Sequence, residues 1–134
     1  MNGAVVLAET DLERLIPRFY ARVREDAQLG PVFNDIVEDW PEHLEKLVAF
    51  WSSVMLGSGR YKGNPVMAHG RHSTRMPPEL FARWLEIWAD VTNEEMAPAI
   101  AAALQAKAGR IAESLQLAMF FRLAPERGAV SQRA

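Results

Sequence analysis

The chain has 134 residues, 49% of them hydrophobic, which suits one domain with a single core. Its 15 basic and 17 acidic residues nearly balance, and this argues against a polycationic surface for nucleic acid or anionic lipid. Cysteine is absent, which excludes disulfides and every site built on thiolate ligands.

The N-terminal stretch MNGAVVLAETDLERL has no basic leader, and no run of about 18 apolar residues follows. We therefore expect neither a signal peptide nor a membrane span, and a cytoplasmic location.

Apolar residues recur at three- and four-residue spacing almost from end to end, which predicts an all-α fold. Thr10-Asp11-Leu12-Glu13 has the form of a capping box and predicts the first helix start. The apolar stripe of this helix then comprises Leu12, Leu15, Ile16, Phe19 and Val23. Pro17 is expected to kink or divide the helix, because proline lacks the amide donor.

Gly30-Pro31 is expected to end this first helical element, followed by a tight turn at residues 32–34. Asp39, with Pro41 in the next turn, predicts a long helix from about Trp40 to Leu56.

Glycines and Pro65 predict a loop over residues 57–65, before at most two helical turns that carry His69 and His72. Pro77-Pro78 predict a helix through about Val91, a turn follows at residues 93–96, and a last helix runs from about Pro98 to near Leu123. Residues 124–134 are expected to be a dispensable tail, so the globular core spans about residues 10–123.

Four polar ring side chains stand out against these apolar stripes. His43 heads the stripe of Leu47, Phe50, Trp51 and Val54, which share one helical face by spacing. Taken alone, His43 is predicted to be a histidine at the boundary of the core, and Tyr20 and Trp84 are predicted to be core residues. His69 follows Gly63-x-Pro65, a context that can hold an imidazole rigidly, and His72 is its rival on nearly the same face.

Together these residues carry more information than any one of them. Phe19-Tyr20, residues 29–34 (LGPVFN), Trp40-x-x-His43 and Phe50-Trp51 precede Tyr61-x-Gly63-x-Pro65-x-x-x-His69 and Trp84. In order and spacing this set resembles the group III truncated haemoglobins over about residues 10–120. The resemblance implies a shortened, two-over-two version of the globin fold, in one domain over residues 1–134.

The resemblance also implies a non-covalently bound haem b. His69 would then be the iron ligand, with His72 left as the alternative, because Gly70-Arg71-His72-Ser73 departs from the family pattern. The distal polar set would be Tyr20, His43 and Trp84. Residues implied to contact the haem, the distal ones included, are Phe33, His43, Leu47, Phe50, Trp51, Val54, Tyr61, Met67, His69, Arg71, Trp84 and Trp88, with Ile87 and Arg75 as further candidates.

A haem protein of this kind implies binding of oxygen, nitric oxide or carbon monoxide. Tight retention of oxygen suits transport poorly and favours redox chemistry, such as nitric oxide dioxygenation or peroxide reduction. Any such turnover needs an external electron donor, since 134 residues leave no room for a reductase domain. The alternative reading is a cofactor-free helical module that binds a partner helix, and a Soret band distinguishes the two.

His43 admits two states at the open end of the distal stripe. It can reach the iron and leave it six-coordinate, or stay outside and leave it five-coordinate. We expect the five-coordinate state, because Tyr20 and Trp84 occupy the space above the iron.

Overall fold

The structure is a computed structural model that describes residues 6–63 and 76–118. Within these ranges every regular element is a helix, which confirms the all-α prediction. The helices are α1 (Glu9–Glu25), α2 (Gly30–Ile36), α3 (Trp40–Leu56), α5 (Pro78–Glu95) and α6 (Pro98–Leu117).

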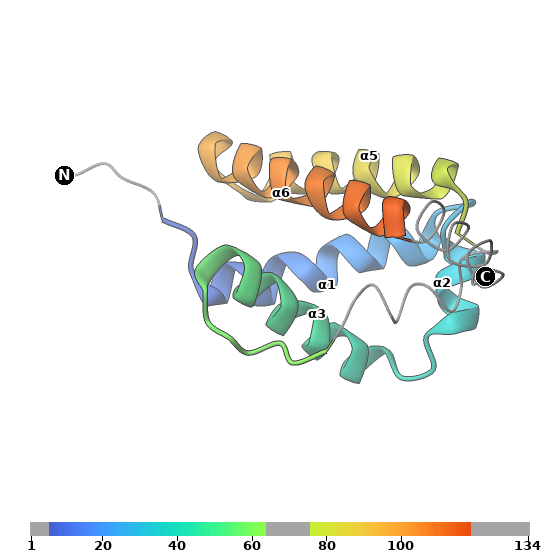
Figure 1. Cartoon of the computed structure of the whole chain (residues 1–134), viewed down its shortest axis with the longest axis horizontal. Helices are drawn as coiled ribbons and strands as arrows, with labels where there is room; N and C mark the ends of the chain where they lie inside the picture. The colour runs from blue at the N-terminus through green and yellow to red at the C-terminus, as the bar shows by residue number, and fades with distance from the viewer. Residues whose placement is uncertain (1–5, 64–75, 119–134) are drawn as a thin grey trace, which may run out of the picture.

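The helices form two stacked layers (Figure 1). One layer holds α5 and α6, which run in opposite directions because only a short turn joins them; the other holds α1 and α3. Helix α1 packs against both α5 and α3, so it is the central element of the fold. This is the two-over-two arrangement expected from the sequence.

The core lies around α1. The five residues of its predicted apolar stripe are all completely buried, namely Leu12, Leu15, Ile16, Phe19 and Val23. Trp51 from α3 and Trp88 from α5 meet them, and the two indoles stack with centroids 4.5 Å apart. Burying such large side chains supplies the main stabilisation of the domain.

Helix α1 begins earlier than the sequence predicted. Its first residue is Glu9, and the Asp11 side chain accepts a hydrogen bond from the Ala8 amide at 2.9 Å. Thr10 therefore lies inside the helix, and its proposed capping role was wrong. The helix is not divided at Pro17, whose ring lies on the exposed face.

The tight turn expected at residues 32–34 is in fact the short helix α2, and the first element already ends at Glu25. The Asp26 carboxylate accepts hydrogen bonds from the amides of Gln28 and Leu29, both at 3.0 Å, and so turns the chain there. Pro31 lies in the first turn of α2, where a missing amide donor costs nothing. The Gly-Pro pair thus starts a helix instead of ending one.

Helix α3 has the predicted bounds. Asp39 caps it by accepting a hydrogen bond from the Glu42 amide at 3.1 Å. Gly57 ends it in the left-handed conformation, with φ of 68°, which glycine adopts without a steric penalty. The predicted loop is confirmed over residues 57–63, and the rest of it lies outside the described residues.

Helix α5 continues one turn beyond the predicted Val91, to Glu95. The buried Thr92 hydroxyl donates a hydrogen bond to the Trp88 carbonyl at 2.7 Å, which satisfies it within the helix. Two surface ion pairs join the extra turn to α1: Arg18 lies 2.6 Å from Glu95, and Arg22 pairs with Glu94. The turn expected at residues 93–96 is therefore helical through Glu95.

Helix α6 starts at Pro98, as predicted, and runs to Leu117 in the described part of the chain; its expected end near Leu123 and the expected tail lie outside the described residues. No helix in the described part of the chain is long and apolar enough to cross a membrane.

We predict that Gly30→Ala destabilises the protein. A Cβ on Gly30 would lie 2.5 Å from the Arg24 carbonyl oxygen, so α2 would have to move away from the end of α1. Overpacking of this kind costs about 1–3 kcal/mol, to be measured as the free energy of unfolding in urea. Gly109→Ala is the matched control, because nothing lies within 4 Å of its added Cβ, and helix propensity should make it stabilising by about 0.5–1 kcal/mol. Equal stability of the two variants would contradict the close contact.

Candidate functional site

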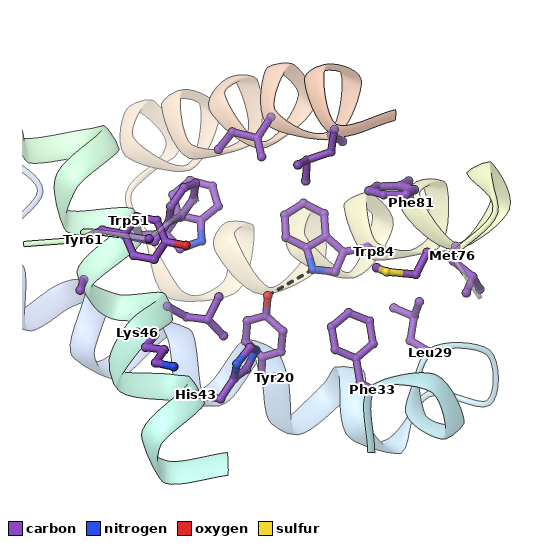
Figure 2. Close-up of a pocket in the computed structure, with 18 of the residues that line it drawn as sticks. Tyr20, Leu29, Phe33, His43, Lys46, Trp51, Tyr61, Met76, Phe81 and Trp84 are labelled. Carbon is purple, nitrogen blue, oxygen red and sulfur yellow. Dashed lines mark hydrogen bonds between the residues drawn. The ribbon is translucent and has the colours of Figure 1, made fainter. Parts of the chain in front are cut away.

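A cavity of about 670 Å³ opens between the two helical layers (Figure 2). This volume is in the usual range for a small-molecule or cofactor site. Apolar and aromatic side chains make most of its wall: Leu29, Phe33, Leu47, Phe50, Trp51, Met76, Leu80, Phe81, Trp84, Ile111, Ala112 and Leu115.

Several of these wall residues are only partly buried. Leu47, Phe50 and Trp84 pack against the core on one side and line the cavity on the other. Apolar groups left open to a cavity of this size favour an apolar ligand that would cover them.

Tyr20 brings a hydroxyl to this apolar wall from α1. Its neighbour Phe19 points into the core, where it contacts Trp84 and Trp88 edge-on. The Tyr20 side chain lies beside it and is only 4% exposed. Burial raises the pKa of Tyr20 to about 12, because the phenolate would lose its hydration, so the hydroxyl keeps its proton at neutral pH.

Trp84 donates a hydrogen bond from Nε1 to the Tyr20 hydroxyl at 3.4 Å, as the dashed line in Figure 2 marks. The phenolic oxygen thus acts as an acceptor toward Trp84, and its own proton remains available to a second acceptor. Both donors lie on the cavity wall. The Tyr20 hydroxyl can therefore donate a hydrogen bond to a ligand that enters, whereas Trp84 gives its one polar hydrogen to Tyr20.

His43 lies in the first turn of α3, where its amide bonds to the Asp39 carbonyl at 3.0 Å. Its ring meets the Tyr20 ring edge-on, with centroids 6.4 Å apart. The three side chains predicted as the distal set, Tyr20, His43 and Trp84, come from three different helices, and all line the cavity.

Eight further residues were predicted to touch a cofactor within the described ranges, Ile87 and Trp88 included. Four line the cavity, namely Phe33, Leu47, Phe50 and Trp51, and Tyr61 joins them from the loop after α3. Val54 packs against the core and does not line the cavity.

Trp88 does not line the cavity either. It is completely buried, and its Nε1 donates to the Leu104 carbonyl at 3.1 Å. It stacks against Trp84, with parallel rings 5.9 Å apart, so it supports a wall residue from behind. Ile87, 5% exposed, is likewise a core residue. Met67, His69, Arg71, His72 and Arg75 lie outside the described residues.

Sequence reasoning missed three cations that also line the cavity: Lys46, Arg60 and Lys62. All three are exposed side chains, so their charges remain hydrated. A signal existed for Lys46, which follows His43 by three residues and therefore shares its side of α3. The loop cations had no periodicity to mark them.

Arg60 is held in place by a network at the end of α3. Its guanidinium donates to a Glu9 carboxylate oxygen at 2.5 Å. The completely buried Ser52 hydroxyl donates to the same carboxylate and shares a 2.7 Å hydrogen bond with Ser58. The start of α1 thus fixes the loop that carries Arg60 and Tyr61.

An apolar cavity with cations among its lining residues suits a flat apolar group that carries carboxylates. The apolar walls would cover the ring system of a haem, and Lys46, Arg60 or Lys62 could pair with its carboxylates. The described residues therefore fit the cofactor that the sequence resemblance implies.

Comparison with known proteins agrees with this geometry. The bacterial-like globin family model matches residues 4–121. The group 3 truncated hemoglobin ctb of Campylobacter jejuni is 36% identical over 96 residues, which cover 66% of this chain and 75% of that protein.

A solved structure gives the corresponding match in three dimensions. The crystal structure of the group III truncated hemoglobin from Campylobacter jejuni superposes with a TM-score of 0.78, at 28% identity, over 88% of this chain and 95% of that one.

We predict that alkaline pH destabilises the protein through Tyr20. Its pKa is about 12 in the fold and about 10 in the unfolded chain, so the unfolded chain loses the proton first, and stability falls as pH rises above 10. Between pH 9 and pH 11 the loss should be on the order of 1 kcal/mol in urea unfolding. Tyr20→Phe lacks the titrating group, so its free energy of unfolding should fall by about 1 kcal/mol less over the same pH range. An identical pH dependence in the two proteins would show that Tyr20 titrates normally.

Proposed function

Because this chain belongs to the bacterial-like globin family and is a truncated haemoglobin of group III, we propose that it binds haem b in the cavity and reversibly binds oxygen or another diatomic ligand there. One observation carries the proposal: Tyr20, whose oxygen accepts a 3.4 Å hydrogen bond from Trp84, presents a hydroxyl donor on the wall of a mostly apolar cavity of about 670 Å³.

The haem would supply an iron with an open position for a diatomic ligand. The chain's own contribution is to hold the cofactor and to set the polarity of the space above it. Leu47, Phe50 and Trp51 on α3 cover apolar surface and exclude water. His69 is proposed to provide the protein ligand to the iron, by its position in the family pattern.

The carboxylates of the cofactor would face the cations among the lining residues. Lys46, Arg60 and Lys62 join Tyr61 and Arg71, the candidates from the sequence, as proposed partners. Arg60 already pairs with Glu9, so it would share its guanidinium between two carboxylates, which its five donors permit.

Ligand retention would depend on the distal hydrogen bonds. Trp84 donates to the Tyr20 oxygen, and the Tyr20 proton then points to the remaining acceptor, an entering ligand. Burial keeps that proton in place far above neutral pH, so the donor is always present under physiological conditions.

Strong retention favours chemistry over delivery. We propose nitric oxide dioxygenation or peroxide reduction as the fitting activities, with the Tyr20 hydroxyl donating a hydrogen bond and His43 able to move protons at the cavity wall. Turnover would need electrons from an external donor. The cofactor-free interaction module remains the competing function, and the absorption spectrum of protein from haem-replete cells distinguishes them, since only the haem protein has a Soret band.

We predict that His69→Ala abolishes or strongly weakens haem retention, because a non-covalent haem in this chain depends on one strong ligand. His72→Ala is the control and should keep the Soret band. Both variants are read from the haem content after gel filtration. Retention in His69→Ala with loss in His72→Ala would transfer the ligand role to His72.

We predict that Tyr20→Phe speeds oxygen dissociation. A buried hydrogen bond to a charged acceptor is worth about 1.5–3 kcal/mol, so its loss should raise the rate by roughly ten- to a hundredfold. The rate is measured by stopped-flow replacement of oxygen by carbon monoxide. Tyr61→Phe is the matched control, since it removes the same hydroxyl from a different part of the cavity wall. If Tyr20→Phe, Trp84→Phe and their double variant all kept the wild-type rate, the donor pair would have no such role.

A further inference from the structure

His43 is packed against a second aromatic residue that does not line the cavity. The Trp40 ring meets the His43 ring edge-on, with centroids 5.6 Å apart and planes at 88°. Trp40 also lies 6.0 Å from the Tyr20 ring. The imidazole therefore contacts two aromatic rings: Tyr20, which lines the cavity, and Trp40, which does not.

Trp40 is itself held from two other helices. The Arg24 guanidinium, at the end of α1, lies 4.5 Å from the centroid of the Trp40 ring in a cation–π contact. Asn34 of α2 fixes Arg24: its Oδ1 accepts from Arg24 Nε at 3.2 Å, and its Nδ2 donates to the Arg24 carbonyl at 3.1 Å. Arg24 of α1 thus contacts the indole directly, and Asn34 of α2 holds Arg24 in place.

This bracing matters because the Asp39 cap fixes the backbone at the start of α3 and leaves the side chains there to be held by other contacts. Trp40 is the first residue of the helix, where backbone amides have no intrahelical acceptor. Without the Arg24 contact, the Trp40 side chain would keep only its contacts with Tyr20, His43 and the core, and its position beside the imidazole would be less restrained. The ring contacts therefore restrain the Trp40 and His43 side chains, which the helix backbone does not restrain at this position.

We propose that Trp40, pinned by Arg24 and Asn34, is a positioning residue that blocks the outward swing of His43 and so limits ligand entry to the cavity. Only the kinetic consequence, the limit on ligand entry, rests on the proposed haem function. The restraint on His43 itself is a property of the chain, and it can be measured without haem.

The first experiment labels histidines of the full-length, haem-free chain with diethyl pyrocarbonate at neutral pH. Trypsin then places His43, His69 and His72 on separate peptides, residues 25–46, 63–71 and 72–75, for mass spectrometry. Trp40→Ala should label His43 about two- to tenfold faster than wild type, the change expected for losing one aromatic contact. His69 and His72 serve as internal references.

Two variants refine this result. Trp40→Phe keeps an aromatic ring beside His43 and should restore nearly the wild-type rate. Arg24→Gln should raise the rate by a smaller factor, whereas Arg14→Gln, which makes the same charge change elsewhere on α1, should have no effect. If Trp40→Ala loses its helical circular dichroism, Arg24→Gln decides the question, because it leaves the Trp40 ring in place.

The second experiment measures carbon monoxide association with the ferrous, haem-loaded protein. Trp40→Ala should speed association by a similar factor, and the gain should vanish in a His43→Ala background, because the two residues act through one another. An equal gain in both backgrounds, or an unchanged His43 labelling rate in both Trp40→Ala and Arg24→Gln, would overturn the proposal. Failure of the chain to bind haem would overturn the proposed function, and the labelling result would still decide the role of Trp40.

Discussion

The stack of Trp51, Trp88 and Trp84 is the contact on which the rest of the structure depends. Trp51 belongs to α3 and the other two to α5, so the stacked indoles join the two layers of the fold directly. Phe19 of α1 closes the group edge-on against Trp88 at 4.8 Å. Large rigid rings bury much area at low entropic cost, and they keep the layers at a fixed separation. The cavity exists because this group supports one side of it.

The same group determines the chemistry of the cavity wall. Trp88 is completely buried and gives its polar atom to a backbone carbonyl, whereas Trp84, one turn away, reaches the cavity and gives its polar atom to Tyr20. Two indoles on the same helix therefore have different roles, because Trp84 lines the cavity and Trp88 does not. A polar pair in an apolar wall would be costly if unpaired, and the mutual hydrogen bond lowers that cost until a ligand arrives.

The cavity combines apolar walls with exposed cationic side chains. The walls are apolar, Lys46, Arg60 and Lys62 are exposed lining residues, and Arg24 braces the start of α3 from outside. Ion pairs between α1 and α5, such as Arg18 with Glu95, are also surface contacts. Such pairs contribute little stability each, but they select one register between helices that packing alone would hold less precisely.

The sequence by itself determined the all-α class, the bounds of α3, the start of α6 and the buried stripe of α1, because caps, prolines and apolar periodicity act over a few neighbouring residues. Its dispersed pattern also indicated the family, and the resemblance implied that Tyr20, His43 and Trp84 form one distal polar set. Only the tertiary structure decided that Gly30-Pro31 starts a helix, that α5 extends to Glu95, that Val54 and Trp88 lie away from the cavity, and that Lys46, Arg60 and Lys62 line it. The start of α2 depends on local signals that the sequence reading did not use, the Asp26 turn and Pro31 in the first helical turn. The other features involve partners distant in the chain, such as Glu9 for Arg60 and Arg22 for Glu94, and no local pattern encodes which distant residues will meet.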